Sequence, residues 1–242
     1  MRTVLVLSGL DPSGGAGIAA DLAAIAAQGV HALPVITALT VQDNNRVYGI
    51  EAVDPALIRR QVQALAGAIA IDAVKVGIPG NRANAETIAA LVLRLRERHP
   101  GLPLVLDPVL ASGHGDALAC GDARAALAPL LALATVVTPN LAEAAALDTS
   151  ACAHVLVTGG HGQGTQVVNA WRGGGQQREW RWTRLPGEFH GSGCMLAAAI
   201  AARLALGEPM AEALELAQAY VQRALADAYS IGPGQRIPRR SH

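Results

Sequence analysis

Short apolar segments alternate with alanine-rich stretches of helical length along most of the chain, and this alternation restricts the possible folds strongly. The apolar segments contain almost no polar residues, which is typical of strands covered on both faces of a sheet. Strands that alternate with helices usually form a parallel sheet with helices on both faces. We therefore predict an α/β protein with a central, mostly parallel sheet. The predicted strands cover residues 4–7, 35–39, 74–76, 104–106, 136–137 and 155–157.

Glycine and polar residues follow these predicted strands directly. In open α/β sheets the ligand binds outside the carboxyl ends of the strands, so the site is expected at this edge. A more polar segment, residues 167–183, predicts antiparallel strands at one end of the sheet, and two helices are expected near residues 191–206 and 210–229. The residues that follow the strands are Asp11, Gln42, Gly77, Asp107, Asn140 and the pair Gly159-Gly160.

Composition narrows the classes of partner. The 242 residues suit one domain spanning 1–242, and the 19 basic and 19 acidic residues balance, so we expect neither a nucleic-acid partner nor a membrane partner. We see no targeting or membrane-spanning segment in the sequence. Three widely spaced cysteines fit neither a disulfide framework nor a zinc site, and they favour a reducing, cytoplasmic location.

Two common nucleotide-binding motifs were weighed and set aside. The segment Gly15-Ala16-Gly17-Ile18-Ala19-Ala20 formally matches a dinucleotide fingerprint, but the second strand does not end in the acid that would bind a ribose. A tight turn alone explains the glycines, yet Asp21, one helical turn later among apolar residues, still needs a polar partner. No P-loop motif occurs, and Lys75 is the only lysine, so backbone amides or arginine must bind any phosphate.

Residues 189–194 form a glycine-rich turn before a strongly apolar helix. The free amides and the dipole at the start of such a helix attract an anion. In isolation, Gly191-Ser192-Gly193 fits a simple helix cap equally well, and Cys194 alone is more often a small buried apolar residue than a reactive thiol. The neighbouring motifs decide between these readings.

Read together and in order, the motifs resemble the hydroxymethylpyrimidine and phosphomethylpyrimidine kinases of thiamine synthesis, which have the ribokinase-like fold. The resemblance spans almost the whole chain. Its most specific parts are the Asp-Pro-Ser-Gly-Gly-Ala-Gly opening and a cysteine where most ribokinase-like enzymes have an aspartate. The matching segments are residues 9–21, Thr37-Ala38-Leu39 with Gln42, Lys75-Val76-Gly77, Asp107-Pro108-Val109, Thr138-Pro139-Asn140 with Glu143, Gly159-Gly160-His161, and His190-Gly191-Ser192-Gly193-Cys194.

This resemblance implies a role for each matching residue. Asp21 and Gln42 would hydrogen-bond an aminopyrimidine, with Gly9, Ile78 and Val109 around its ring. Asp107, Asn140, Thr158 and Gly160 would contact ATP, and Glu143 would bind Mg²⁺ through water. The amides of Gly191, Ser192 and Gly193 would neutralise the transferred phosphoryl group while Cys194 aligns the acceptor hydroxyl and takes its proton. The family commonly performs two successive phosphorylations, and the resemblance favours a homodimer.

Several alternatives stay open at this stage. Asn140 and Glu143 also fit a helix-capping pair, and the helix dipole is expected to lower the pKa of Cys194 and make it reactive toward iodoacetamide. Departures from the family are Thr158 in place of a lysine, Ile78 in place of a methionine, His114 in place of a serine, and a short connection over residues 147–154. The competing functions are a pyridoxal kinase and a non-catalytic pyrimidine-binding protein.

Overall fold

The computed structural model describes residues 1–160 and 162–241. Its described strands form one sheet in the order β3-β2-β1-β4-β5-β6-β7-β8-β9. Neighbouring strands from β2 to β7 run parallel, whereas β3, β8 and β9 each pair antiparallel with their neighbours. The strands are β1 (Thr3–Leu10), β2 (His31–Gln42), β3 (Val47–Ala52), β4 (Ala73–Val76), β5 (Leu104–Leu106), β6 (Val136–Val137), β7 (His154–Val157), β8 (Gln166–Gly173) and β9 (Gln176–Thr183).

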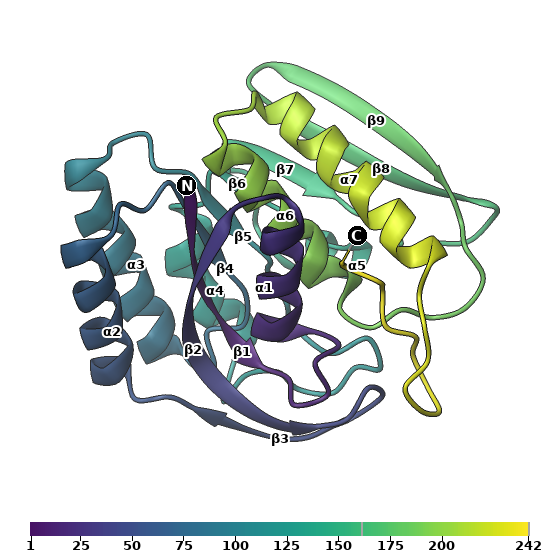
Figure 1. Ribbon diagram of the computed structural model, residues 1–242, viewed down its shortest axis with the longest axis horizontal. Coiled ribbons are helices and arrows are strands. Elements are labelled where there is room, and N and C mark those ends of the chain that lie inside the picture. The colour runs from purple at the N-terminus through teal and green to yellow at the C-terminus, as the bar shows by residue number, and fades with distance from the viewer. Residues whose placement is uncertain (161, 242) are drawn as a thin grey trace.

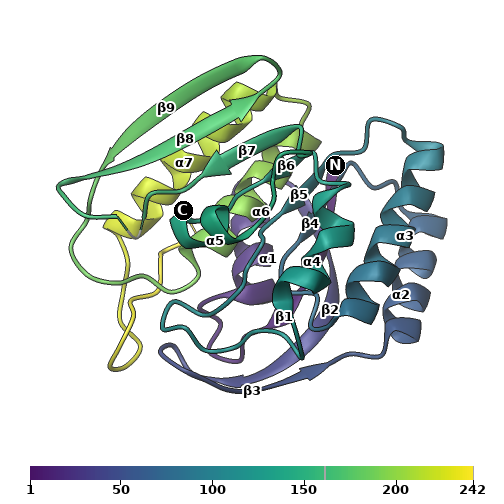
Figure 2. The same cartoon turned by 180° about the vertical axis from the view of Figure 1, so that it is seen from behind.

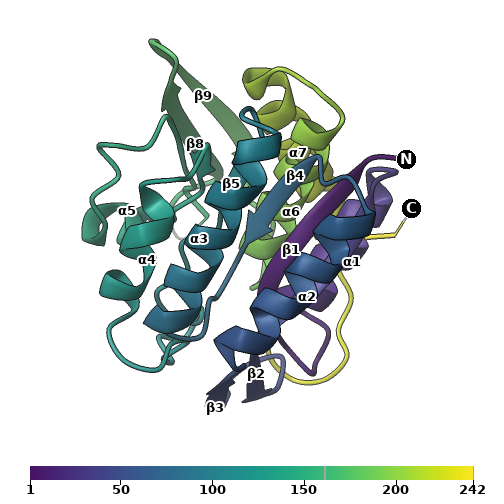
Figure 3. The same ribbon diagram turned by 90° about the vertical axis from the view of Figure 1, so that its left-hand side faces the viewer.

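Helices cover both faces of the sheet, as Figures 1 and 3 show. The helices α1, α6 and α7 lie on one face, and α2, α3, α4 and α5 lie on the other, which faces the viewer in Figure 2. This arrangement confirms the predicted α/β class. The helices are α1 (Gly17–Ala27), α2 (Pro55–Ala68), α3 (Arg82–Arg98), α4 (Ala123–Leu131), α5 (Leu141–Ala146), α6 (Ser192–Ala205) and α7 (Met210–Ala226).

The six predicted strands are present, and the polar segment 167–183 forms the expected antiparallel pair, β8 and β9. One element was not predicted. β2 runs to Gln42, three residues beyond its apolar segment, and pairs there with β3. The outer half of β2 alternates between more and less exposed residues, with Leu39 and Val41 on the open face, because only part of this hairpin is covered by the helices. It therefore lacks the continuous apolar pattern of a central strand.

Two apolar clusters hold the layers together. One joins the sheet to α1, α6 and α7, and the other joins it to α2, α3 and α4. The run Met195–Ala202 of α6 is entirely buried, and small alanine side chains let this helix pack closely on the sheet. None of the described helices is long and apolar enough to cross a membrane.

The strand order places a crevice beside β1. The chain passes from β1 through α1 to β2 on one side, and β4 lies on the other side of β1 and continues through α3 to β5. Because α1 and α3 lie on opposite faces, the loops after β1 and β4 diverge at the carboxyl edge of the sheet (Figure 1). Such a switch point is where open α/β sheets bind ligands.

Candidate active site

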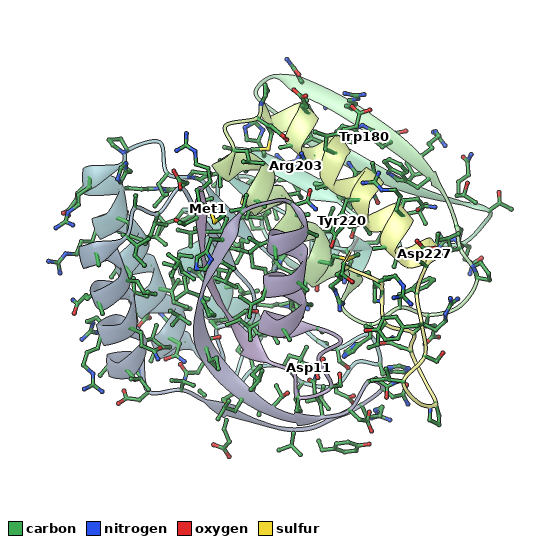
Figure 4. The ribbon with its side chains drawn as sticks, in the orientation of Figure 1. Met1, Asp11, Trp180, Arg203, Tyr220 and Asp227 are labelled. Carbon is green, nitrogen blue, oxygen red and sulfur yellow. The ribbon has the colours of Figure 1, made fainter. Side chains whose placement is uncertain are left out.

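The loop after β1 is organised around the buried carboxylate of Asp11, which Figure 4 labels at the end of the strand. This carboxylate accepts hydrogen bonds from the backbone amides of Ser13 (2.8 Å) and Ala16 (2.7 Å), and it pairs with His190 Nε2 at 2.8 Å. Burial raises the pKa of Asp11, but hydrogen bonds from His190 and Ser13 outweigh burial and lower it to about 2. Asp11 thus stays ionised and joins the first loop to the turn before α6.

The residue immediately before α6, Gly191, has to be a glycine. Gly191 has φ of +73°, and a Cβ on it would overlap the carbonyl oxygen of Gly15. The two glycine-rich loops, which are far apart in sequence, therefore meet backbone to backbone. This contact fixes the position of the start of α6, where the first backbone amides of a helix lack intrahelical partners.

A buried ion pair lies beneath this turn. Lys75 Nζ on β4 donates to Asp21 Oδ2 on α1 at 2.7 Å, and both side chains are fully buried. A Cβ on Gly77 would overlap Ser8 Oγ and lie 2.8 Å from Lys75 Nζ, so the Lys-Val-Gly motif keeps room for the ammonium group. Sequence reasoning missed this partner, although a single lysine within a buried strand was a usable signal.

Asp107 adds a second carboxylate to this buried cluster. It follows β5, is 5% exposed, and its Oδ1 would lie 3.9 Å from a Cβ on Gly193. Burial raises the pKa of both Asp107 and Asp21. Burial alone would lower the pKa of Lys75, but the negative charges of Asp21 and Asp107 raise it instead. The cluster therefore holds one cation between two carboxylates near the turn before α6.

Cys194 lies in the first turn of α6, partly exposed. The lowered pKa expected for its thiol is wrong: burial and the neighbouring Asp107 charge raise the pKa well above its usual range. Desolvation and two carboxylates outweigh the helix dipole, whose effect on one charge is about 1 kcal/mol. The thiol is therefore protonated at neutral pH, which argues against its predicted role as the proton acceptor. Its alignment of the acceptor hydroxyl stays a prediction.

This raised pKa reverses the expected order of cysteine reactivity. Only the thiolate reacts with iodoacetamide, so at pH 7.5 we expect Cys194 to be alkylated more slowly than the exposed Cys120. The rate at Cys194 should rise steadily from pH 7.5 to 10. Peptide mass analysis of a time course measures both sites in the same sample. Faster labelling of Cys194 than of Cys120 at pH 7.5 would contradict the assignment.

Asn140 and Glu143 form the helix-capping pair at the start of α5. Asn140 Oδ1 accepts from the Glu143 amide at 2.9 Å, and Glu143 Oε2 accepts from the Asn140 amide at 2.8 Å. The capping alternative is thus confirmed. Burial and the charge of Asp107 raise the pKa of Glu143 to about 7. A capping role leaves metal binding possible, because each Glu143 oxygen keeps lone pairs beyond the amide it accepts from.

The loop after β7 is held by buried polar side chains from the antiparallel end of the sheet. Asn169 Oδ1 accepts from the Gly159 amide at 2.9 Å, and Gln218 on α7 accepts from Asn169 at 2.9 Å. Arg184 donates to the carbonyls of Gly160 (2.6 Å) and Gly159 (3.3 Å). Arg184 therefore lies beside the loop that follows Thr158, the position where the family resemblance predicts a lysine. His161 lies outside the described residues.

The remaining predicted residues divide between two sides of the turn. On one side, a Cβ on Gly9 would lie 3.6 Å from Ile78 Cδ1, and Gln42 lies close enough to Asp11 to lower its pKa. On the other side, Thr158 bridges to Asn140. Val109 follows β5, and its amide donates to the Asp107 carbonyl at 2.9 Å. Asp21 is fully buried against Lys75, so its hydrogen bond to a pyrimidine stays a prediction.

The described residues contain no group of three or more histidine, cysteine, aspartate or glutamate side chains that could bind a metal by themselves. Two carboxylates nevertheless suit a shared cation. Asp107 lies close enough to raise the pKa of Glu143, and Asp107 Oδ2 has no hydrogen-bond partner in the part of the chain that the structure describes. These oxygens fit Mg²⁺ that keeps several waters and binds phosphate oxygens.

Comparison with known proteins identifies relatives over nearly the whole chain. The chain is 40% identical over 259 residues to a hydroxymethylpyrimidine/phosphomethylpyrimidine kinase of Rhizobium meliloti, covering 96% of this chain and 94% of the relative. It is 35% identical to the thiamine biosynthesis multifunctional protein ThiED of Corynebacterium efficiens, covering 96% of this chain but 34% of that longer protein.

Solved structures share the fold. An ADP complex of Bacillus subtilis pyridoxal kinase superposes with a TM-score of 0.86 at 25% identity, covering 99% of this chain and 97% of the other. The phosphomethylpyrimidine kinase of Clostridium difficile gives a TM-score of 0.78 at 29% identity, covering 93% and 100%. The family model for phosphomethylpyrimidine kinase matches residues 11–153 and 146–238. The chain therefore belongs to the phosphomethylpyrimidine kinase family, whose named relatives are kinases of thiamine biosynthesis.

Proposed function

We propose that the protein transfers the γ-phosphoryl group of ATP to 4-amino-5-hydroxymethyl-2-methylpyrimidine, and then phosphorylates the monophosphate to the diphosphate. The observation that carries this proposal is the meeting of two glycine-rich loops at the switch point, where Gly191 lies against Gly15. Gly9 and Ile78 lie to one side of this contact and provide an apolar surface for a ring. Asn140 and Thr158 adjoin each other beside β6 and β7, where the nucleotide would lie.

In this mechanism the hydroxymethyl oxygen attacks the γ-phosphorus while the bond to the leaving ADP oxygen breaks, and the hydroxyl proton is then released to solvent. The transition state is loose, so catalysis depends on positioning and on stabilising charge at the phosphoryl oxygens. The amides of Gly191, Ser192 and Gly193 supply that stabilisation. Little proton removal is needed before the old bond breaks, so a protonated Cys194 thiol is sufficient to orient the hydroxyl.

Mg²⁺ would be bound by Glu143 through water, with Asp107 adding negative charge nearby, and it would neutralise the phosphate charges when present. Asp107, Asn140, Thr158 and Gly160 complete the proposed nucleotide side. Gln42 and Val109 would extend the ring surface formed by Gly9 and Ile78. Ring and phosphates are thus held on opposite sides of the turn before α6, which is the arrangement that an in-line transfer requires.

The proposed Mg²⁺ site gives a pH-dependent prediction for Glu143→Gln. With a pKa of about 7, Glu143 is mostly protonated at pH 6 and ionised at pH 8. The Mg²⁺ concentration for half-maximal activity should therefore fall from pH 6 to 8 in the wild type. In Glu143→Gln it should be about tenfold higher at pH 8 and nearly independent of pH, because the side chain cannot ionise.

Stability without Mg²⁺ provides a second readout for Glu143. A carboxyl whose pKa is raised in the folded state loses stabilisation as pH rises from about 4.5 to 7. Between pH 5 and 8, Tm should therefore fall more in the wild type than in Glu143→Gln. Glu97→Gln, at an exposed position on α3, is the control. An unchanged Mg²⁺ requirement in Glu143→Gln would leave only the capping role.

A product assay separates the competing functions. Purified protein is incubated with Mg-ATP and either hydroxymethylpyrimidine or pyridoxal, and products are identified by mass. We expect hydroxymethylpyrimidine monophosphate and then diphosphate. Preferential phosphorylation of pyridoxal would favour the alternative that the Bacillus subtilis pyridoxal kinase neighbour suggests. Binding of the pyrimidine without ADP formation would indicate a non-catalytic protein.

We further infer that residues 1–242 act as one kinase domain in a cytoplasmic homodimer. One sheet joins every described strand, which supports a single domain. Three free cysteines support a reducing compartment.

The exposed apolar side chains of Leu39 (47% exposed), Val41 (62%) and Tyr48 (68%) lie on the β2–β3 hairpin and would be covered in a dimer. Light scattering with Val41→Glu tests the dimer.

A further inference from the structure

The last residues of the chain return to the turn before α6. Arg236 and Phe189 form a bridge in which the His190 amide donates to the Arg236 carbonyl and the Arg236 amide donates to the Glu188 carbonyl, both at 2.9 Å. Ile237 then pairs with Tyr229, just after α7. Figure 1 shows this yellow segment leaving α7 and turning back on itself. The C-terminal segment is thus built into the candidate active site.

Arg240 is the buried cation of this segment. It is 6% exposed, and its guanidinium donates to the carbonyl oxygens of Gly15 and of His190, the latter at 3.3 Å. Its own carbonyl accepts from the hydroxyl of Tyr220 at 2.9 Å, and Figure 4 labels Tyr220 on α7. Arg240 therefore touches both of the loops that meet at Gly191.

Among the described residues, no carboxylate forms an ion pair with Arg240, and its Nε has no hydrogen-bond partner. Burial lowers the pKa of Arg240. Buried charges are normally paired because desolvation is costly. A buried arginine that contacts only carbonyl oxygens, at the edge of an anion-binding turn, calls for a functional account.

The two carbonyl contacts suggest how Arg240 acts. The His190 carbonyl belongs to the same peptide group as the Gly191 amide, and a charged donor on the oxygen polarises the whole group. Polarisation makes the Gly191 N–H a stronger donor toward a phosphoryl oxygen. The Gly15 carbonyl lies against Gly191, so the second contact fixes the separation of the two loops. Charge-assisted bonds of this kind are stronger than neutral ones.

We propose that Arg240 is a positioning residue for phosphoryl transfer, which strengthens and fixes the first amide of the anion-binding turn from behind. This inference rests on the phosphoryl-binding role proposed above for Gly191 to Gly193. Arg240 acts through the His190–Gly191 peptide group and the Gly15 carbonyl. Its contribution is therefore greatest in the transition state, where the phosphoryl oxygens bind most tightly.

The test uses three variants of the full chain. Arg240→Met removes the charge and the donors while keeping much of the volume, and Arg240→Lys keeps the charge. The matched control is Arg239→Met, because Arg239 is exposed and its guanidinium lies over the Tyr229 ring at 5.3 Å. Steady-state kcat and KM for both substrates are measured with hydroxymethylpyrimidine and Mg-ATP, and the fraction of folded enzyme is measured by circular dichroism.

In Arg240→Met we expect kcat per folded enzyme to fall about tenfold, which is less than the loss of a whole oxyanion donor. The KM of the acceptor should change less than twofold. Arg240→Lys should recover at least a third of wild-type kcat, and Arg239→Met should match the wild type. A purely structural role predicts a lower Tm with unchanged kcat per folded enzyme in Arg240→Met, and that result would overturn the proposal.

If Arg240→Met does not fold, the decision passes to Arg240→Gln and Arg240→Lys. Glutamine keeps two N–H donors without the charge, so equal kcat in these two variants would overturn the polarisation argument, and a lower kcat in Arg240→Gln would support it. Absence of turnover in the wild type would instead reject the proposed function. A failure of the Arg240 proposal can therefore be told apart from a failure of the proposed function.

Discussion

Replacing Gly191 with alanine is expected to lower kcat by about 10² to 10³, which is the usual cost of losing one preorganised donor to a developing oxyanion. The structure gives two reasons. The residue has φ of +73°, where side chains other than glycine are strained, and an added Cβ would overlap the Gly15 carbonyl oxygen. The turn would have to move away from the first loop. KM for the acceptor should change much less, because the ring surface at Gly9 and Ile78 is untouched.

A matched substitution at the other end of α6 separates strain from function. Gly207 has φ of +88°, and a Cβ there would meet no atom within 4 Å. Gly207→Ala therefore carries a similar backbone cost, of order 1 kcal/mol, without disturbing the site. It should lower Tm and leave kcat intact. A folded Gly191→Ala enzyme with kcat within threefold of the wild type would show that the turn does not bind the transferred group.

Among the variants proposed, Lys75→Met should lower the free energy of unfolding most, by about 3–5 kcal/mol, because it leaves the carboxylate of Asp21 buried without its partner. The deficit should depend on pH. Burial raises the pKa of Asp21, and without Lys75 only weaker interactions would oppose that rise. A carboxyl with a raised folded-state pKa loses stabilisation as pH increases above its unfolded value of about 3.9. The variant should thus be closest to the wild type near pH 4 and weakest at neutral pH.

Urea unfolding at pH 4.5 and pH 7.5 measures this difference. The double variant Lys75→Met, Asp21→Asn removes both charges and should recover a large part of the stability, because a matched neutral pair needs no buried counter-charge. A Lys75→Met deficit that is the same at both pH values, and that Asp21→Asn does not reduce, would exclude the ion pair as its cause.

The local sequence patterns predicted the fold class correctly. Continuous apolar segments such as residues 74–76 bury both faces of a strand, and that requirement alone leads to a parallel sheet covered by helices. The hairpin of β2 and β3 was missed because its outer residues are half exposed and resemble a loop. The sequence also places Asp11, Asp107 and Asn140 at the correct edge, since parallel strands end together.

The local sequence patterns predicted the protonation and charge partners of buried side chains least well. The start of a helix suggested a reactive Cys194, but Asp107 and burial raise its pKa, and both effects come from residues distant in sequence. Asp21 was expected to need a polar partner, and the structure shows that Lys75, 54 positions away, is one. Electrostatic energies depend on separation in space and on desolvation, and neither can be read from spacing along the chain.

The sequence by itself determined the α/β class, the strand and helix order and the edge of the sheet that carries the polar residues, because these follow from apolar periodicity and glycine positions. Only the tertiary structure decided which distant groups meet: Gly191 against Gly15, Lys75 against Asp21, and Arg240 against the His190 carbonyl. Each of these contacts joins segments that close packing brings together after the chain has folded, and no local propensity specifies them.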